Sequence, residues 1–136
     1  MLKPLLTTTA IALFAITGTA CAGEGTKAPP GGDYQQVSKL VALPDFLPGI
    51  GTLYVQPATL PAGPFLAYDR DGRLVSTIYM IPIKDIEAHT KFDDLAVGTR
   101  DVVDVDMYYN AGHPGVEEPH YHVVLWHVPE KDAKLE

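Results

Sequence analysis

The sequence predicts an α+β domain that is mostly antiparallel β, built as a small sheet or a barrel-like structure, with one short helix near residues 84–96. Three observations lead to this prediction. Apolar segments occur in pairs joined by short loops, one further segment has apolar residues at helical spacing, and most other connections are rich in Pro and Gly. The 136 residues are enough for one domain.

Residues 1–20 have the composition of an export signal peptide rather than of a folded element. Lys3 supplies positive charge near the start, residues 5–16 are apolar except for three threonines, and small residues follow. The apolar run is shorter than the about 20 residues that a membrane-spanning helix needs. We therefore expect the mature protein to be exported.

Two cleavage sites in this signal remain open. Cleavage before Cys21, the single cysteine, would expose it at the N-terminus for lipidation and give a lipoprotein of the cell membrane or outer membrane. Gly18 stands where lipoprotein signals usually carry Leu. Cleavage after Ala22 would instead release a periplasmic or secreted protein. Neither product has an internal disulfide.

The rest of the chain divides into a polar segment and one domain. Residues 21–36 are rich in Gly and Pro and are predicted to form a flexible tether, and residues 37–136 a single β-rich domain. The net charge of −7 becomes −8 when Lys3 is lost with the signal. An acidic exported domain is not expected to bind nucleic acid.

The first strand of the domain is predicted over residues 52–56, where Pro57 stops it. A β-hairpin follows. Residues 65–68 and 74–80 are apolar and flank a short loop that ends in Asp-Gly, which is typical of a tight turn. Both alternating faces of the second segment carry apolar residues, so we expect a central strand that ends at Pro82.

The helix prediction is based on Ile86, Phe92 and Leu95, which repeat at loose helical spacing. Thr90 and Asp93 have the spacing of a capping box, and Gly98 is a natural stop. His89 lies just outside this cap, so we expect it at the surface or in a capping role rather than in a metal site.

Residues 101–109 and 120–128 are predicted to form a second hairpin around a loop at 110–119. Their register decides what faces the histidines. If Tyr109 is opposite His120, the wall beside the histidines is apolar, whereas a slip of one residue brings Tyr108, Asp106 and Asp104 to that face. The sequence leaves this open, so Asp104 and Asp106 are secondary candidates, with a solvated sheet face as the alternative.

Four of the five histidines lie between residues 113 and 127. Residues two apart in a strand point to the same side, so His120 and His122 present two imidazoles to one face. Such a pair can bind one divalent transition metal, namely Zn, Mn, Fe, Ni or Cu. His113 could fold over the pair from its loop. His127 faces the other way in a regular strand and joins only if a bulge intervenes.

Acidic residues in the same loop extend the candidate site. Glu117, with Glu118 beside it, could supply an oxygen ligand or a general base. The catalytic residues, if there are any, are not identified. Two interpretations without metal also remain open: a hydrogen-bonded cluster that handles protons, and a purely structural cluster.

The histidine segment has a partial resemblance to a known metal motif. The pattern Gly115-x4-His120-x-His122-x4-His127 is similar to the first metal motif of cupins, which have Glu where this chain has His127. The second cupin motif, with its further histidine, is not present after His127. A small cupin-like metalloenzyme is therefore kept as an alternative, but an ordinary cupin is not expected.

A second resemblance covers most of the predicted domain. The Gly-x-Gly bend at 49–51, residues 63–82, the Gly-His-Pro-Gly loop at 112–115 and the Pro-His-Tyr strand at 119–121 resemble a family of exported bacterial domains of unknown function, first seen structurally in a Thermus protein. In that family a histidine often follows the bend, where this chain has Thr52. The resemblance implies a β-rich fold and possible assembly into a homo-oligomer, and it implies no activity.

Three functions follow as hypotheses. The first is a histidine-centred metal-binding module without catalysis. The second is a small metalloenzyme, which needs an open coordination position beside a pocket. The third is a structural or protein-interaction domain without metal.

Overall fold

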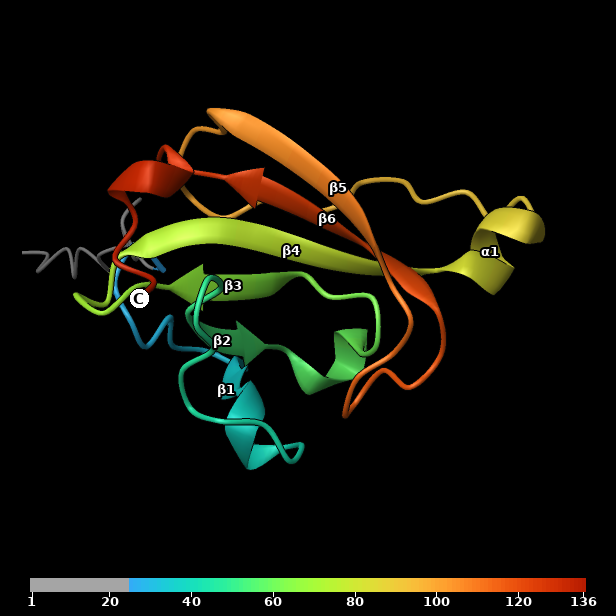
Figure 1. The fold of residues 1–136 in the computed structure, drawn as a ribbon, viewed down its shortest axis with the longest axis horizontal. Coiled ribbons are helices and arrows are strands. Elements are labelled where there is room, and N and C mark those ends of the chain that lie inside the picture. Colours follow the sequence, from blue (N-terminus) through green and yellow to red (C-terminus); the bar gives the residue numbers. More distant parts are fainter. Residues whose placement is uncertain (1–24) are drawn as a thin grey trace, which may run out of the picture.

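The computed structural model describes residues 25–136, which form one open antiparallel sheet (Figure 1). Its six strands are β1 (Gln35–Gln36), β2 (Thr52–Val55), β3 (Phe65–Tyr68), β4 (Leu74–Pro82), β5 (Asp104–Asn110) and β6 (His120–Trp126). Their order across the sheet is β1-β2-β3-β4-β6-β5, and all neighbours are antiparallel. The predicted mostly antiparallel fold is confirmed, in its sheet form rather than as a barrel.

Both predicted hairpins are present, β3 with β4 and β5 with β6. All residues of β4 are buried, because this strand lies between β3 and β6 and carries apolar side chains on both faces. It ends at Pro82, and β2 stops two residues before Pro57. These strands agree with the prediction because alternating apolar residues, turn residues and prolines act on the neighbouring residues of the chain.

The helix α1 covers Ile83–Glu87, so the predicted helix over 84–96 is much too long. Thr90 and Asp93 lie beyond its end and form no capping box, because His89 turns the chain with a positive φ of 58°. Leu95 is 44% exposed, so no apolar surface supports a longer helix. Within residues 25–136, three short 3₁₀ segments cover Val37–Lys39, Pro57–Thr59 and Glu130–Asp132.

The two faces of the sheet are covered mainly by irregular segments, and the 3₁₀ segment Val37–Lys39 adds the buried Val37. The main core lies on the face that carries Phe65, Ile78 and Trp126, and residues from 41–50 and 133–135 pack against it. A smaller cluster around Tyr68 and Leu74 occupies the other face. The main face is the one that holds the candidate site.

Residues 25–36 lie against the sheet, which differs from the predicted flexible tether. The amide of Leu74 donates to the carbonyl of Thr26, and the amide of Ala28 donates to that of Gly72. Tyr34 packs on the smaller cluster, and Gln35–Gln36 pairs with β2. This segment, although rich in Pro and Gly, is therefore bound to the sheet. The predicted signal peptide and Cys21 lie outside the described residues.

The strand β5 forms one edge of the sheet and is exposed along most of its length (Figure 1). Val105, Met107 and Tyr109 point to one side of it, and Met107 is 60% exposed. Of the helices in the described part of the chain, none is long and apolar enough to cross a membrane.

Candidate metal centre

The strand β6 presents two histidines to the core face of the sheet. His120 is fully buried and His122 is 4% exposed. Across the sheet, His122 is opposite Met80 on β4 and Tyr108 on β5. The alternation of β6 thus places the two imidazoles side by side, with ring centroids 4.9 Å apart, as the sequence predicts.

The loop between β5 and β6 brings the third histidine over this pair. The backbones of His113 and Val116 exchange two hydrogen bonds of 2.9 and 3.0 Å. Pro114 and Gly115 occupy the two central positions, with φ of +91° at Gly115, which is the residue order of a type II turn. Because Val116 is buried in the core, this turn fixes His113 against the sheet.

The three histidines converge through their Nε2 atoms. The Nε2 of His122 lies 2.9 Å from that of His120 and 3.3 Å from that of His113. In each residue one potential ligand atom lies within 4.8 Å of those of the other two, so the triad could hold a metal ion. Two nitrogens bound to one Zn²⁺ at 2.0–2.1 Å lie roughly 2.9–3.4 Å apart for angles of 90–109°. The observed separations fit that range.

The Nδ1 atoms of two of these histidines face backbone carbonyl oxygens. The Nδ1 of His120 lies 2.7 Å from the carbonyl oxygen of Glu118, and that of His113 lies 3.0 Å from that of Pro114. A carbonyl only accepts hydrogen bonds, so in the neutral rings the proton belongs on Nδ1 and the lone pair on Nε2. Histidines that bind metal are typically oriented in this way.

His122 differs, because its Nδ1 lies 3.0 Å from the hydroxyl of Tyr108, which can donate or accept. Burial is the largest cause that lowers the pKa of His122, and the neighbouring His120 and His113 add to it, which gives a pKa of about 4. Burial also raises the pKa of Tyr108. Near neutral pH, His122 is therefore an uncharged imidazole, the form that binds metal.

The structure places the other candidate residues away from the triad. His127 is buried elsewhere, with Nε2 2.7 Å from Oγ1 of Thr77 and Nδ1 3.0 Å from the carbonyl oxygen of Asp101. No bulge turns it toward His120 and His122, since β6 keeps a regular register. Glu117 is exposed and not part of the cluster.

Two further candidates have surface roles. Glu118 forms an exposed ion pair of 2.8 Å with Lys84. His89 is exposed after the end of α1, where its amide donates to the carbonyl of Ile86. The surface or capping role expected for His89 agrees with this position.

Of the two predicted registers, the second is observed. Tyr108 is opposite His122 and Asp106 is opposite Val124, so Asp104 and Asp106 share the face of the histidines. Asp106 accepts a hydrogen bond of 2.8 Å from the indole of Trp126. Asp104 accepts one from the amide of Val105. Asp106 therefore links β5 to β6, Asp104 bonds only within β5, and neither acid is in the metal-ligand cluster.

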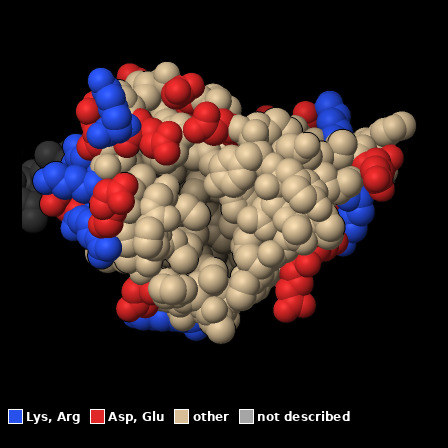
Figure 2. Space-filling model, in the orientation of Figure 1, with Lys and Arg blue, Asp and Glu red and all other residues tan. Residues whose placement is uncertain are grey.

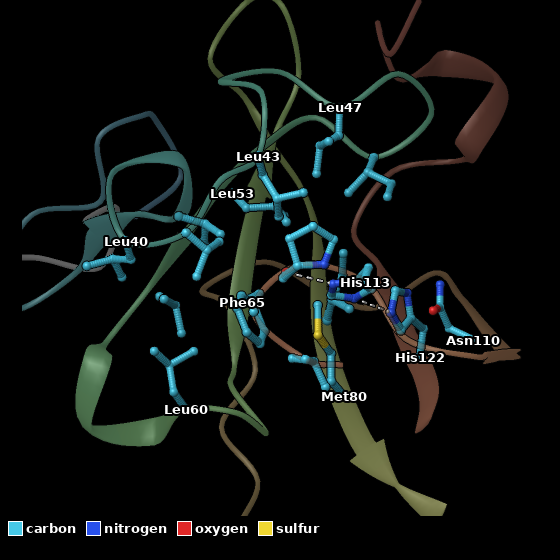
Figure 3. A pocket seen from close by; sticks show the side chains of 18 residues that line it. Leu40, Leu43, Leu47, Leu53, Leu60, Phe65, Met80, Asn110, His113 and His122 are labelled. Carbon is cyan, nitrogen blue, oxygen red and sulfur yellow. Dashed lines mark hydrogen bonds between the residues drawn. The ribbon is translucent and has the colours of Figure 1, made fainter. Parts of the chain in front are cut away.

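The triad borders an apolar cavity that sequence reasoning missed. Figure 2 shows a hollow near the centre of one face, surrounded by uncharged residues. The cavity of about 250 Å³ is lined by segments far apart in the chain, including Leu40, Leu60, His113 and His122. Figure 3 shows the two leucines at one end of it and the two histidines at the other. No local sequence pattern indicates such a space.

Fold and site together define a small antiparallel β-sheet protein with a cluster of three histidines, two of them buried, beside an apolar cavity. Among solved structures, it is similar to the hypothetical protein TTHB210 from Thermus thermophilus, with 46% identity and a TM-score of 0.58. The match covers 68% of this chain and 87% of the Thermus chain. The chain therefore belongs to the family of this Thermus protein. Comparisons with protein-family models and with curated proteins found no match.

The family assignment agrees with the resemblance to a Thermus protein of unknown function that was found in the sequence. The Thermus protein is described only as hypothetical, so membership supplies no activity. The function has to be argued from the site.

Proposed function

We propose that this protein binds one divalent transition metal through the Nε2 atoms of His113, His120 and His122. The observation that carries the proposal is the convergence of these three atoms while two of the Nδ1 atoms face carbonyl oxygens. Lone pairs that face one another at such distances repel unless a proton or a metal ion lies between them.

The alternative without metal is also specific. A proton on Nε2 of His122, shared with His120 and His113, would satisfy the cluster, and the hydroxyl of Tyr108 would then donate to Nδ1 of His122. Metal binding moves that proton to Nδ1 and makes Tyr108 the acceptor. The two states therefore differ in the tautomer of one buried ring.

The three histidine ligands favour some metals over others. Three imidazoles suit Zn²⁺, Cu²⁺, Ni²⁺ and Fe²⁺, whereas Mn²⁺ favours carboxylate oxygens, which are not in the cluster. Zn²⁺ accepts three protein ligands and one exchangeable ligand readily. It is the metal with which we would test the site first.

The test is metal uptake by protein purified without a histidine tag. We expect one Zn²⁺ per chain at pH 7.5 by titration calorimetry and elemental analysis. His120→Ala or His122→Ala should abolish uptake, and His113→Ala should weaken it. His89→Ala is the matched control, since this exposed histidine lies outside the cluster. Wild-type protein that takes up no metal at micromolar concentrations would refute the proposal.

A small metalloenzyme is the second candidate. Its support is that His113 and His122 line the cavity, so a metal held by them would have an open side toward this apolar space. A metal-binding module without catalysis requires no such opening. A structural domain without metal is the outcome if uptake fails.

The setting of this site in the cell is proposed from the sequence. Residues 1–20 support export, and Cys21 supports a lipid anchor in the membrane. Intact-mass analysis should show an acylated N-terminal Cys21, and an unmodified N-terminus at Gly23 would exclude the anchor. Assembly into a homo-oligomer is supported by the exposed apolar side of β5, and light scattering would measure it.

A further inference from the structure

The cavity beside the triad has one polar end and otherwise apolar walls. Its volume is about 250 Å³, and among the described residues no Lys, Arg, Asp or Glu lines it. Leu53, Phe65 and Met80 belong to the walls, and the polar side chains are those of Asn110, His113 and His122. A ligand in this space would therefore contact polar side chains only with the end that lies beside the histidines.

The volume sets the size of that ligand. An apolar cavity of about 150 Å³ holds one benzene molecule, which has six non-hydrogen atoms. A cavity of about 250 Å³ therefore holds roughly ten. Leu40 and Leu60 are 37% and 41% exposed at the end away from the histidines, so a linear molecule can enter there head first (Figure 3).

The charge of a bound metal determines which chemical group the ligand would place at the polar end of the cavity. Three neutral imidazoles leave the full double charge of a bound Zn²⁺ in a wall that carries no anionic side chain among the described residues. A carboxylate supplies the missing ligand and also neutralises part of that charge, whereas a neutral alcohol or amine can supply a ligand but no negative charge. A medium-length aliphatic tail would fill the apolar part of the space.

We infer that the site takes an aliphatic monocarboxylate of about eight carbons, with the carboxylate on the metal and the tail in the cavity. This inference rests on the proposed metal site. Octanoate has the required size and serves as the probe. Butyrate has the same head with a short tail, and 1-octanol has a similar tail without the charge.

The experiment is calorimetric titration of the whole protein, zinc-loaded and zinc-free, with each of the three probes. Octanoate should bind the zinc-loaded form at least tenfold more tightly than the zinc-free form, and 1-octanol should bind both forms equally. Octanoate has four more methylenes than butyrate, and each buried methylene contributes roughly fourfold, so octanoate should bind roughly 200-fold more tightly than butyrate. Protein that takes up no zinc refutes the metal site itself, and this inference with it.

With zinc bound, two results would overturn the inference alone. One is equal binding of octanoate to both forms, and the other is less than a threefold difference between octanoate and butyrate. Leu60→Asp places a negative charge at the mouth and should weaken octanoate binding at least tenfold while zinc affinity stays unchanged. Leu95→Asp is the matched control, since Leu95 is similarly exposed but does not line the cavity. Equal effects of the two substitutions would also contradict the inference.

Discussion

The Nδ1 atom of His122 lies 3.0 Å from the hydroxyl oxygen of Tyr108. His122, whose Nε2 contacts both His113 and His120, is therefore oriented by a residue of the neighbouring strand β5. The contact exists because the register of β5 and β6 places the two residues opposite each other. It orients the central ligand of the proposed site from outside the triad.

Replacing Tyr108 with Phe should therefore weaken zinc binding without removing it. Loss of a hydrogen bond that orients a metal-bound histidine typically costs about 10- to 100-fold in metal affinity. Competition with a chelator would measure the affinity. Tyr109→Phe is the matched control, because Tyr109 points to the other side of β5. Equal zinc affinity of the wild type and Tyr108→Phe would argue against this orienting role.

The metal-free protein should lose stability as the pH falls below about 6.5. The pKa of His122 is lowered to about 4 in the folded state, chiefly by burial, whereas an unfolded histidine titrates near 6.5. The unfolded chain therefore binds the proton more readily. The stabilisation from neutral His122 is complete above about pH 6.5 and is lost progressively as the pH falls toward about 4.

Urea unfolding with a chelator present, at pH values between 7.5 and 4.5, would measure this loss. Other groups titrate in the same range, so the informative quantity is the difference between the wild type and His122→Gln. The wild type should lose more of its free energy of unfolding than the variant. Parallel curves would show that His122 does not carry this pH dependence.

Gly112→Ala should disturb the loop that carries His113. A Cβ at this position would lie 2.3 Å from the carbonyl oxygen of Glu117, and the φ of +131° is unfavourable for alanine. We expect a cost of about 1–3 kcal/mol in unfolding free energy together with weaker zinc binding. Gly32→Ala is the control, since that glycine also has a positive φ but its Cβ would meet nothing within 4 Å. Unchanged zinc affinity in Gly112→Ala would mean that His113 is not needed in the site.

His127→Ala should lower stability and leave zinc stoichiometry unchanged. This buried ring contacts Thr77 and the carbonyl of Asp101, and removing one partner of a buried hydrogen bond costs about 1–3 kcal/mol. Denaturant unfolding and a zinc titration of the same sample would separate the two effects. Loss of zinc from a folded His127→Ala protein would contradict the placement of this residue outside the site.

How far the sequence could predict this structure depends on the range of the interactions. Alternating apolar residues predicted both hairpins and put His120 and His122 on one face, because strand alternation is a local property. The predicted helix extends too far because Phe92 and Leu95 repeat at helical spacing, although Leu95 is 44% exposed and gives a longer helix no packing support. Composition predicts a tether for residues 21–36 because it does not reveal that residues 25–36 have partners on and beside β2 and β4.

At the candidate site, too, the sequence predicts the local geometry and not the long-range contacts. The distance of five residues between His122 and His127 correctly indicates opposite faces. The convergence of His113 on the pair depends on the turn at Pro114-Gly115 and on the burial of Val116. The periodicity of apolar residues predicts neither of them. The register that brings Tyr108 to His122 is set by the whole sheet, so the sequence left two choices.

X-ray absorption spectroscopy of the zinc-loaded protein, purified without a tag, tests the central claim most directly. We predict three imidazole nitrogens at about 2.0–2.1 Å from the zinc, with one further oxygen or nitrogen ligand completing the shell. In His122→Ala this signature should be lost. A zinc shell made of oxygen ligands, or one with fewer than two imidazoles, would contradict the assignment of the metal to His113, His120 and His122.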